Sequence, residues 1–165
     1  KEHILSARIN KLFVTMMLTI LMLVTGCVSN NSNADDVLGD VETDTVLAQY
    51  PLFSEEYQSF DITQQQTARM KEWPAQLTID VYFGTWCHDS QREVPRLLKA
   101  LAANTSVELN LIALDYQKSE PEGRAKRANV KYTPTFVVSL SGKEIGRIIE
   151  RPKISLIDDI SNMLE

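Results

Sequence analysis

The stretch LTIDVYFGTWCHDSQREVP, Leu77–Pro95, predicts a buried strand that turns directly into a helix. Its first seven residues are rich in β-branched and aromatic types, which favour a central strand. A Gly-Thr pair then turns the chain, and a helix is predicted from about 88 to 103. Trp86 and Cys87 therefore lie between the end of a strand and the start of a helix. The apolar residues of that helix recur at helical spacing: Val94, Leu97, Leu98 and Leu101.

Strands and helices alternate on both sides of this junction. A helix capped by Asp61 is predicted to run to about Glu72, ahead of Pro74. The later elements are a strand at 107–114, a short helix at 121–128, a hairpin of strands at 135–140 and 144–149, and an amphipathic helix at 154–164 with Ile154, Ile157, Ile160 and Leu164 on one stripe. This order predicts an α/β domain over residues 61–165, with a central mixed β-sheet flanked by helices on both faces.

Composition narrows the possible chemistry. The chain has 165 residues and a formal net charge of −5, which argues against nucleic acid as a partner because a basic surface supplies most of that affinity. It has two cysteines, Cys27 and Cys87, and two histidines, His3 and His88. A disulfide framework or a four-cysteine zinc site needs more sulfur than this. We expect neither a metal nor another cofactor.

The amino-terminal residues 1–26 have the pattern of a secretory signal. A basic start is followed by the 13-residue apolar run 12–24 and by small residues. A membrane-spanning helix needs about 20 apolar residues, so an uncleaved anchor is the less favoured alternative. The junction Val-Thr-Gly-Cys27 resembles the lipobox of bacterial lipoproteins, which implies a lipid on Cys27 and a membrane partner through that anchor. Val28 resembles the outer-membrane sorting pattern of Gram-negative lipoproteins, so we expect a cell-envelope lipoprotein that, in a Gram-negative source, lies in the outer membrane and faces the periplasm.

The next segment, residues 27–60, carries the lipidated cysteine and a connection to the domain. Residues 28–45 are polar and acidic, which predicts a flexible spacer. Residues 46–60 contain a few apolar side chains without clear periodicity and receive no assignment.

The order of elements resembles the thioredoxin family over roughly residues 61–165. Trp86 and Cys87 stand at the strand-to-helix turn, and Pro95 follows Cys87 by eight residues, where thioredoxins place a helix-kinking proline. Thr133 and Pro134 precede a strand, with the proline 47 residues after Cys87, as the family's cis-proline does. The resemblance implies a thioredoxin-like fold, a reactive Cys87, and thiols or disulfides of proteins or small molecules as partners.

The predicted position of Cys87 suits a reactive thiol. Unsatisfied N–H groups and the positive end of the helix dipole both favour the thiolate, which is the nucleophile. His88 adds positive charge when protonated, whereas Asp89 opposes the thiolate by like-charge repulsion. Ser90 lies one turn further on, where its hydroxyl is expected to donate a hydrogen bond to the sulfur. Trp86 is expected to form a packing platform beside the thiol.

Two departures from the family pattern change the expected mechanism. Ser90 occupies the position of the second cysteine, and a serine cannot form a disulfide. Val81 occupies the position of the family's buried aspartate, and the adjacent Asp80 should point to the opposite face of the strand. We therefore expect a single catalytic thiol, Cys87, assisted by Ser90, Trp86 and His88, with Thr133 and Pro134 at the substrate.

Other interpretations stay open at this point. Cys87 is inert or regulatory if the domain is a binding or scaffold module. A single-cysteine peroxidase is disfavoured because Gly84 stands where such enzymes carry threonine, and a metal site at residues 87–89 is disfavoured because consecutive helical residues diverge around the axis. We expect Arg92, Glu93 and Arg96 to lie on a solvated helix face, or alternatively to form a rim for an acidic partner.

Overall fold

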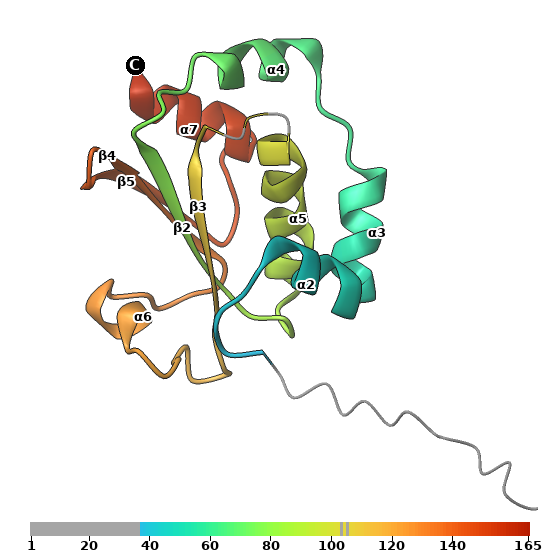
Figure 1. The fold of residues 1–165 in the computed structure, drawn as a ribbon, viewed down its shortest axis with the longest axis vertical. Coiled ribbons are helices and arrows are strands. Elements are labelled where there is room, and N and C mark those ends of the chain that lie inside the picture. Colours follow the sequence, from blue (N-terminus) through green and yellow to red (C-terminus); the bar gives the residue numbers. More distant parts are fainter. Residues whose placement is uncertain (1–36, 103, 105) are drawn as a thin grey trace, which may run out of the picture. The chain divides into compact units, whose positions relative to one another are not determined.

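The computed structural model describes residues 37–102, 104 and 106–165. The expected signal segment and Cys27 lie outside these residues. The elements are β1 (Gly39–Asp40), α2 (Thr43–Gln49), α3 (Pro51–Ser59), α4 (Gln64–Lys71), β2 (Leu77–Phe83), α5 (His88–Ala102), β3 (Glu108–Ala113), α6 (Arg124–Arg127), β4 (Thr135–Leu140), β5 (Lys143–Ile149) and α7 (Leu156–Leu164) (Figure 1). Within the described part of the chain, every helix is too short or too polar to cross a bilayer.

Five strands form one mixed sheet in the order β1-β3-β2-β4-β5. β2 lies in the middle, where it pairs in parallel with β3 and antiparallel with β4. β5 pairs antiparallel with β4, and β1 antiparallel with β3. The predicted fold class is confirmed, and β2 and β4 have the bounds that their β-rich composition predicts.

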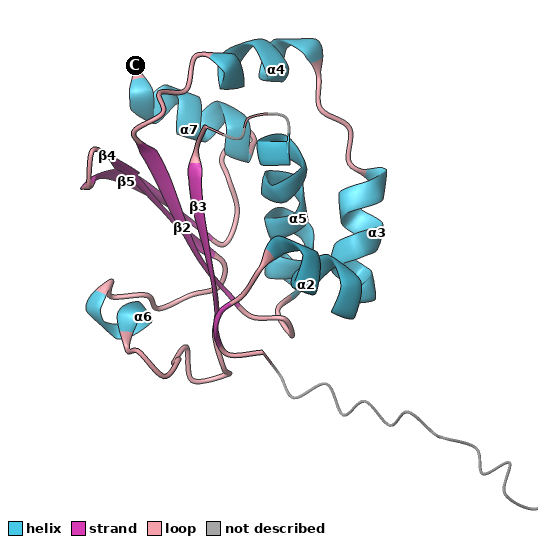
Figure 2. Cartoon of the chain, in the orientation of Figure 1, coloured by secondary structure: helices cyan, strands magenta, loops and turns pink. Residues whose placement is uncertain are grey.

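The two faces of the sheet carry separate apolar clusters. Ile79, Val81 and Phe83 point toward α5 and belong to the larger cluster, which also includes side chains of α2, α3, α4 and α7. Tyr82 lies on the opposite face in a smaller cluster with Ala125 of α6. Figure 2 shows α6 across the sheet from α5 and α7. Helices therefore cover both faces, as the element order predicts, and most of the core lies under α5.

Residues 37–60 belong to the folded unit, which corrects the expected spacer over residues 37–45 and places the start of the domain ahead of the predicted residue 61. β1 joins the sheet edge, α3 lies beside α5, and α2 packs against α3 (Figure 1). Val46 and Phe53 are 0% exposed, and the Phe53 ring meets Phe83 edge-on with centroids 5.8 Å apart. Each of these helices buries a single side chain, so the stretch shows little sequence periodicity although its packing is extensive.

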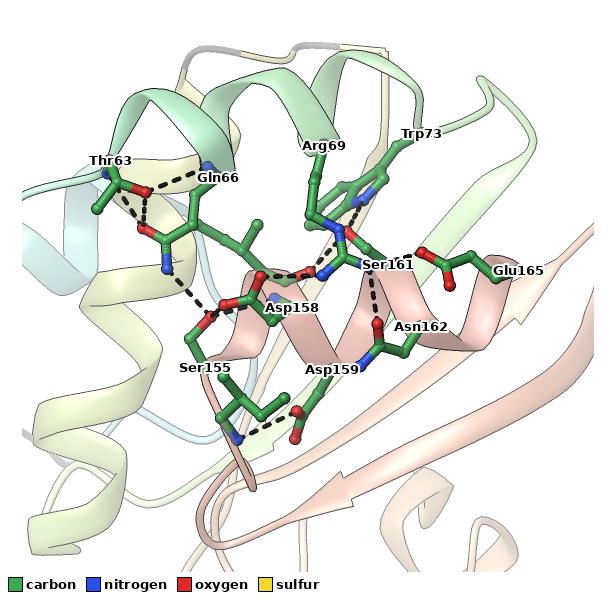
Figure 3. A network of polar contacts seen from close by, with 12 residues as sticks. Thr63, Gln66, Arg69, Trp73, Ser155, Asp158, Asp159, Ser161, Asn162 and Glu165 are labelled. Carbon is green, nitrogen blue, oxygen red and sulfur yellow. Dashed lines mark hydrogen bonds and ion pairs between the residues drawn. The ribbon is translucent and has the colours of Figure 1, made fainter.

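A polar network fastens α4 to the carboxyl-terminal helix α7 (Figure 3). Thr63, rather than the expected Asp61, caps α4, and its capping box with Gln66 satisfies backbone groups at the helix start. The Gln66 amide also donates to the Ser155 hydroxyl at 3.1 Å, and Ser155 caps α7. Ile154 precedes that cap and is exposed, so it does not belong to the predicted apolar stripe of the last helix.

Asp158 is the central acid of this network. It accepts a hydrogen bond from the Ser155 hydroxyl at 2.6 Å and pairs with Arg69 at 3.0 Å. The hydrogen bond from Ser155 lowers the pKa of Asp158, and the bonds from Arg69 and Gln66 lower it further. Together they outweigh partial burial, which raises it. The ionised carboxylate is therefore the form that holds the two helices together.

Candidate functional site

Cys87 is the residue immediately before α5. Its N–H donates to the Gly84 carbonyl at 3.0 Å, and its own carbonyl accepts from the Gln91 N–H at 2.9 Å. The second of these bonds is the first turn of the helix, so Cys87 stands in the N-cap position. Its half-buried sulfur lies at the amino terminus of a 15-residue helix, as the sequence predicts.

The sulfur faces the segment that starts β4. The Cys87 thiol donates to the Thr133 carbonyl oxygen at 3.1 Å, and the Thr133–Pro134 peptide is cis, as expected from the sequence. Residues separated by 46 positions therefore meet at the thiol. This contact places the Thr133 carbonyl, and with it the cis peptide to Pro134, at the Cys87 sulfur.

Ser90 is completely buried one turn after Cys87. Its hydroxyl accepts a hydrogen bond from the Gly84 N–H at 3.2 Å. The bond found for Ser90 therefore runs to the turn that precedes the cysteine, instead of the expected bond to the sulfur. Ser90 braces the loop that holds Cys87, and this role alone accounts for a polar side chain at a buried position.

The two residues between Cys87 and Ser90 behave differently. His88 is exposed, whereas the Asp89 carboxylate accepts from Arg92 at 2.8 Å and from Arg151 at 3.0 Å. Two guanidinium groups thus offset the charge of Asp89, which weakens the repulsion expected between this residue and a thiolate. The hydrogen bond to Glu93 raises the pKa of Arg92, which keeps that guanidinium charged.

Trp86 carries an aromatic stack beside the thiol. Its ring lies parallel to Tyr116 with centroids 4.4 Å apart, and the Lys118 ammonium sits 4.7 Å from its centroid. The indole N–H donates to the Leu114 carbonyl at 3.2 Å. Gly84 makes room for the ring, because a Cβ at this position would lie 2.6 Å from it. Trp86 is therefore fixed in place, while Tyr116 is exposed.

The sequence model of a family described as thioredoxin matches residues 41–157, well over half of the chain. The chain belongs to the thioredoxin family. Its domain therefore starts before residue 61 in sequence as well as in structure.

Solved structures with a TM-score above 0.5 share the fold. A protein of unknown function, PA1234, from Pseudomonas aeruginosa is 18% identical, with a TM-score of 0.61 over 76% of this chain and 92% of that one. An HIV epitope scaffold is 15% identical, with the same TM-score and coverage. Thioredoxin from Fasciola hepatica is 23% identical over 57% of this chain and 86% of its own, with a TM-score of 0.44. No curated protein matches the sequence.

The structure also shows the surroundings of Val81, which occupies the position of the family's buried aspartate. Val81 is fully buried in the cluster under α5, whereas Asp80 lies on the other face and accepts a hydrogen bond from Asn110 at 2.8 Å. The expected opposite orientation of Asp80 is confirmed. With Val81 in place of the aspartate and Ser90 in place of the second cysteine, the motif has neither a second thiol nor the acid that would assist it.

Sequence reasoning missed Tyr116, Lys118 and Arg151 at this site. Each lies on a loop, and each reaches the motif through a contact between distant positions, such as the 62-residue separation of Arg151 from Asp89. It also misplaced Glu93, whose side chain is 5% exposed and whose carboxylate accepts a hydrogen bond from Arg92 at 2.7 Å. The solvated face expected for Arg92, Glu93 and Arg96 is in fact a charged cluster that is partly buried.

Proposed function

We propose that the protein carries out thiol–disulfide exchange with Cys87 as its single reactive thiol and an external thiol as the resolving group. The observation that carries this proposal is the Cys87 sulfur at the amino terminus of α5, 3.1 Å from the Thr133 carbonyl, with serine in place of a resolving cysteine. Membership of the thioredoxin family supports thiols and disulfides as its substrates.

The exchange proceeds in three displacements, none of which uses a second cysteine of this chain. The Cys87 thiolate attacks one sulfur of a substrate disulfide, which forms a mixed disulfide and releases the other sulfur as a thiolate. An external thiolate then attacks the Cys87 sulfur and releases the second substrate sulfur. A second external thiolate then attacks the first external sulfur, which releases the Cys87 thiolate and forms a disulfide between the two external thiols. Two external thiols are oxidised for each substrate disulfide reduced.

A redox-inactive binding module is the second candidate. It is favoured by the bond between Gly84 and Ser90, which gives the serine a structural role that needs no chemistry at Cys87. In that case Cys87 forms no covalent adducts with partners, and the exposed ring of Tyr116 belongs to a binding surface.

Trapping of mixed disulfides separates the two candidates. The full-length chain is expressed with a carboxyl-terminal tag, free thiols are blocked with iodoacetamide on lysis, and adducts are resolved on non-reducing gels. We expect adducts that disappear with dithiothreitol and in Cys87→Ser but persist in Ser90→Ala. Adducts equally abundant in Cys87→Ser, or none in the parent chain, contradict the exchange mechanism.

We also propose that a lipid on Cys27 tethers the domain to a membrane of the cell envelope. The apolar run before Val-Thr-Gly-Cys27 supports this assignment. Because the folded unit includes residue 37, the chain from Cys27 to this residue reaches at most about 35 Å, which limits how far residue 37 can lie from the lipid. Cell fractionation tests the tether: we expect Cys27→Ser to leave the membrane fraction, and an unchanged distribution contradicts the assignment.

A further inference from the structure

A pocket of about 270 Å³ lies beside α5, against the segment that joins β5 to α7. Three arginines line it, Arg92 and Arg96 from α5 and Arg151 from the joining segment. Phe60 and Pro152 contribute apolar surface, and Glu93 contributes to the lining. This volume is just below the roughly 300–1,000 Å³ that is usual for ligand pockets, so it suits one small group rather than a protein chain.

The charged side chains of this pocket differ in burial: an acidic side chain is buried and an arginine is exposed. The Glu93 side chain is 5% exposed, and its carboxylate lies 2.7 Å from Arg92 and 3.7 Å from Arg96, whereas the Arg151 side chain is 68% exposed. Arg96 also pairs with Glu56 at 2.6 Å. The acids offset the summed charge of the arginines and hold them in place. Each guanidinium has five N–H donors, so donors remain after these pairs are made.

The pocket and the thiol share their supports. Arg92 and Arg151 both bind Asp89, which follows Cys87 by two residues. On the other side, the Glu150 N–H donates to the Pro134 carbonyl at 2.7 Å, which ties the residue before Arg151 to the cis-proline. A ligand that binds the exposed Arg151 side chain therefore contacts a residue that is linked both to the start of α5 and to the cis-proline segment, the two segments that position the sulfur.

We propose that this pocket binds a carboxylate of a low-molecular-weight thiol and thereby selects the external thiol that exchanges with Cys87. The inference rests on the proposed function for its catalytic meaning, whereas the binding itself does not depend on it. Guanidinium groups recognise carboxylates through paired N–H donors, which gives the pocket a preference for anionic over neutral thiols.

The test compares an anionic with a neutral disulfide, using the full-length chain with Cys27→Ser so that Cys87 is its sole thiol. The two disulfides are glutathione disulfide and bis(2-hydroxyethyl) disulfide. In each case the Cys87 thiolate attacks the disulfide, forms a mixed disulfide and releases one thiolate. The rate at which the mixed disulfide forms is measured by mass spectrometry. Because Arg151 also offsets the charge of Asp89 beside the thiol, Arg151→Gln can slow both reactions. We expect it to slow the glutathione reaction about tenfold or more beyond its effect on the neutral reaction, through the loss of one charge-assisted bond.

Arg127→Gln is the matched control, because Arg127 is an exposed arginine on α6 that does not line this pocket. It should change neither rate. If Arg151→Gln slows both disulfides equally, Arg151 acts only through Asp89 and Cys87, and the pocket proposal is overturned. An unchanged glutathione rate in Arg151→Gln overturns it as well.

A binding experiment separates this proposal from the function of Cys87. S-methylglutathione carries the same carboxylates but no thiol, and its binding is measured by calorimetry on the Cys87→Ser chain. We expect saturable binding that Arg151→Gln weakens and Arg127→Gln does not. If Cys87 reacts with neither disulfide, the proposed exchange fails while this result still supports the pocket. Absence of saturable binding overturns the pocket whatever the exchange rates are.

Discussion

Restoring the second thiol with Ser90→Cys tests whether the site keeps the geometry of a dithiol thioredoxin. Residues three apart at a helix start have Cα atoms about 5 Å apart, within the 4.4–6.8 Å that a disulfide accepts. The substitution removes a hydroxyl that accepts from the Gly84 N–H, and sulfur is a weaker acceptor. We expect the reduced variant to lose about 1–2 kcal/mol of unfolding free energy.

Oxidation should return most of that loss. A disulfide closing a four-residue loop restricts the unfolded chain by about 2 kcal/mol in the chain-entropy account, so the oxidised variant should come within about 1 kcal/mol of the parent. Activity should rise as well, because the resolving step becomes intramolecular. In reduction of insulin by dithiothreitol, followed as turbidity, we expect Ser90→Cys to exceed the parent by about tenfold or more.

Two controls define what this result means. Ser90→Ala also loses the acceptor for Gly84 but adds no thiol, so it should show the stability loss without the gain in activity. Adding Cys87→Ser to Ser90→Cys should abolish the gain. The reasoning is refuted if the two thiols do not form an intramolecular disulfide under oxidant, or if activity survives without Cys87.

Three further predictions concern the scaffold. Gly84→Ala should displace the Trp86 ring, which lies 2.6 Å from the added carbon, and slow reaction of Cys87 with a neutral disulfide; unchanged indole fluorescence would refute this. Phe53→Ala, at a fully buried position, should cost about 3–5 kcal/mol in urea unfolding, whereas the exposed neighbour variant Leu52→Ala should stay within about 0.5 kcal/mol; equal effects would return this segment to a spacer. Because the pKa of Asp158 is lowered in the fold, its ionised form stabilises the protein above the ordinary value of 3.8, and this contribution is lost as pH falls through the lowered value. Asp158→Asn should therefore be less stable than the parent at pH 7, and the two unfolding curves should converge below about pH 4; a constant difference would contradict the assignment.

Local patterns in the sequence determined the parts of the fold that depend on near neighbours. The β-rich composition of β2, the helical spacing of α5 and the Thr-Pro pair before β4 each depend on a few adjacent residues, so their elements and their order followed without a structure. The loss of a second thiol at Ser90 was equally plain, because it is a matter of residue identity. The position of Asp80 on the far face followed from strand alternation.

The tertiary structure decided whatever depends on contacts between distant residues. Phe53 reads as an isolated apolar residue, and only its packing against Phe83 and α5 places α3 within the domain. Ser90 turns its hydroxyl to Gly84, and Asp89 meets Arg151 across 62 residues of sequence. Sequence periodicity does not predict such pairs, because contacts between residues far apart in the sequence depend on how the whole chain packs and not on local propensity. The sequence by itself determined a thioredoxin-like fold with one thiol in its motif, whereas the arginine surroundings of that thiol came from the folded chain alone.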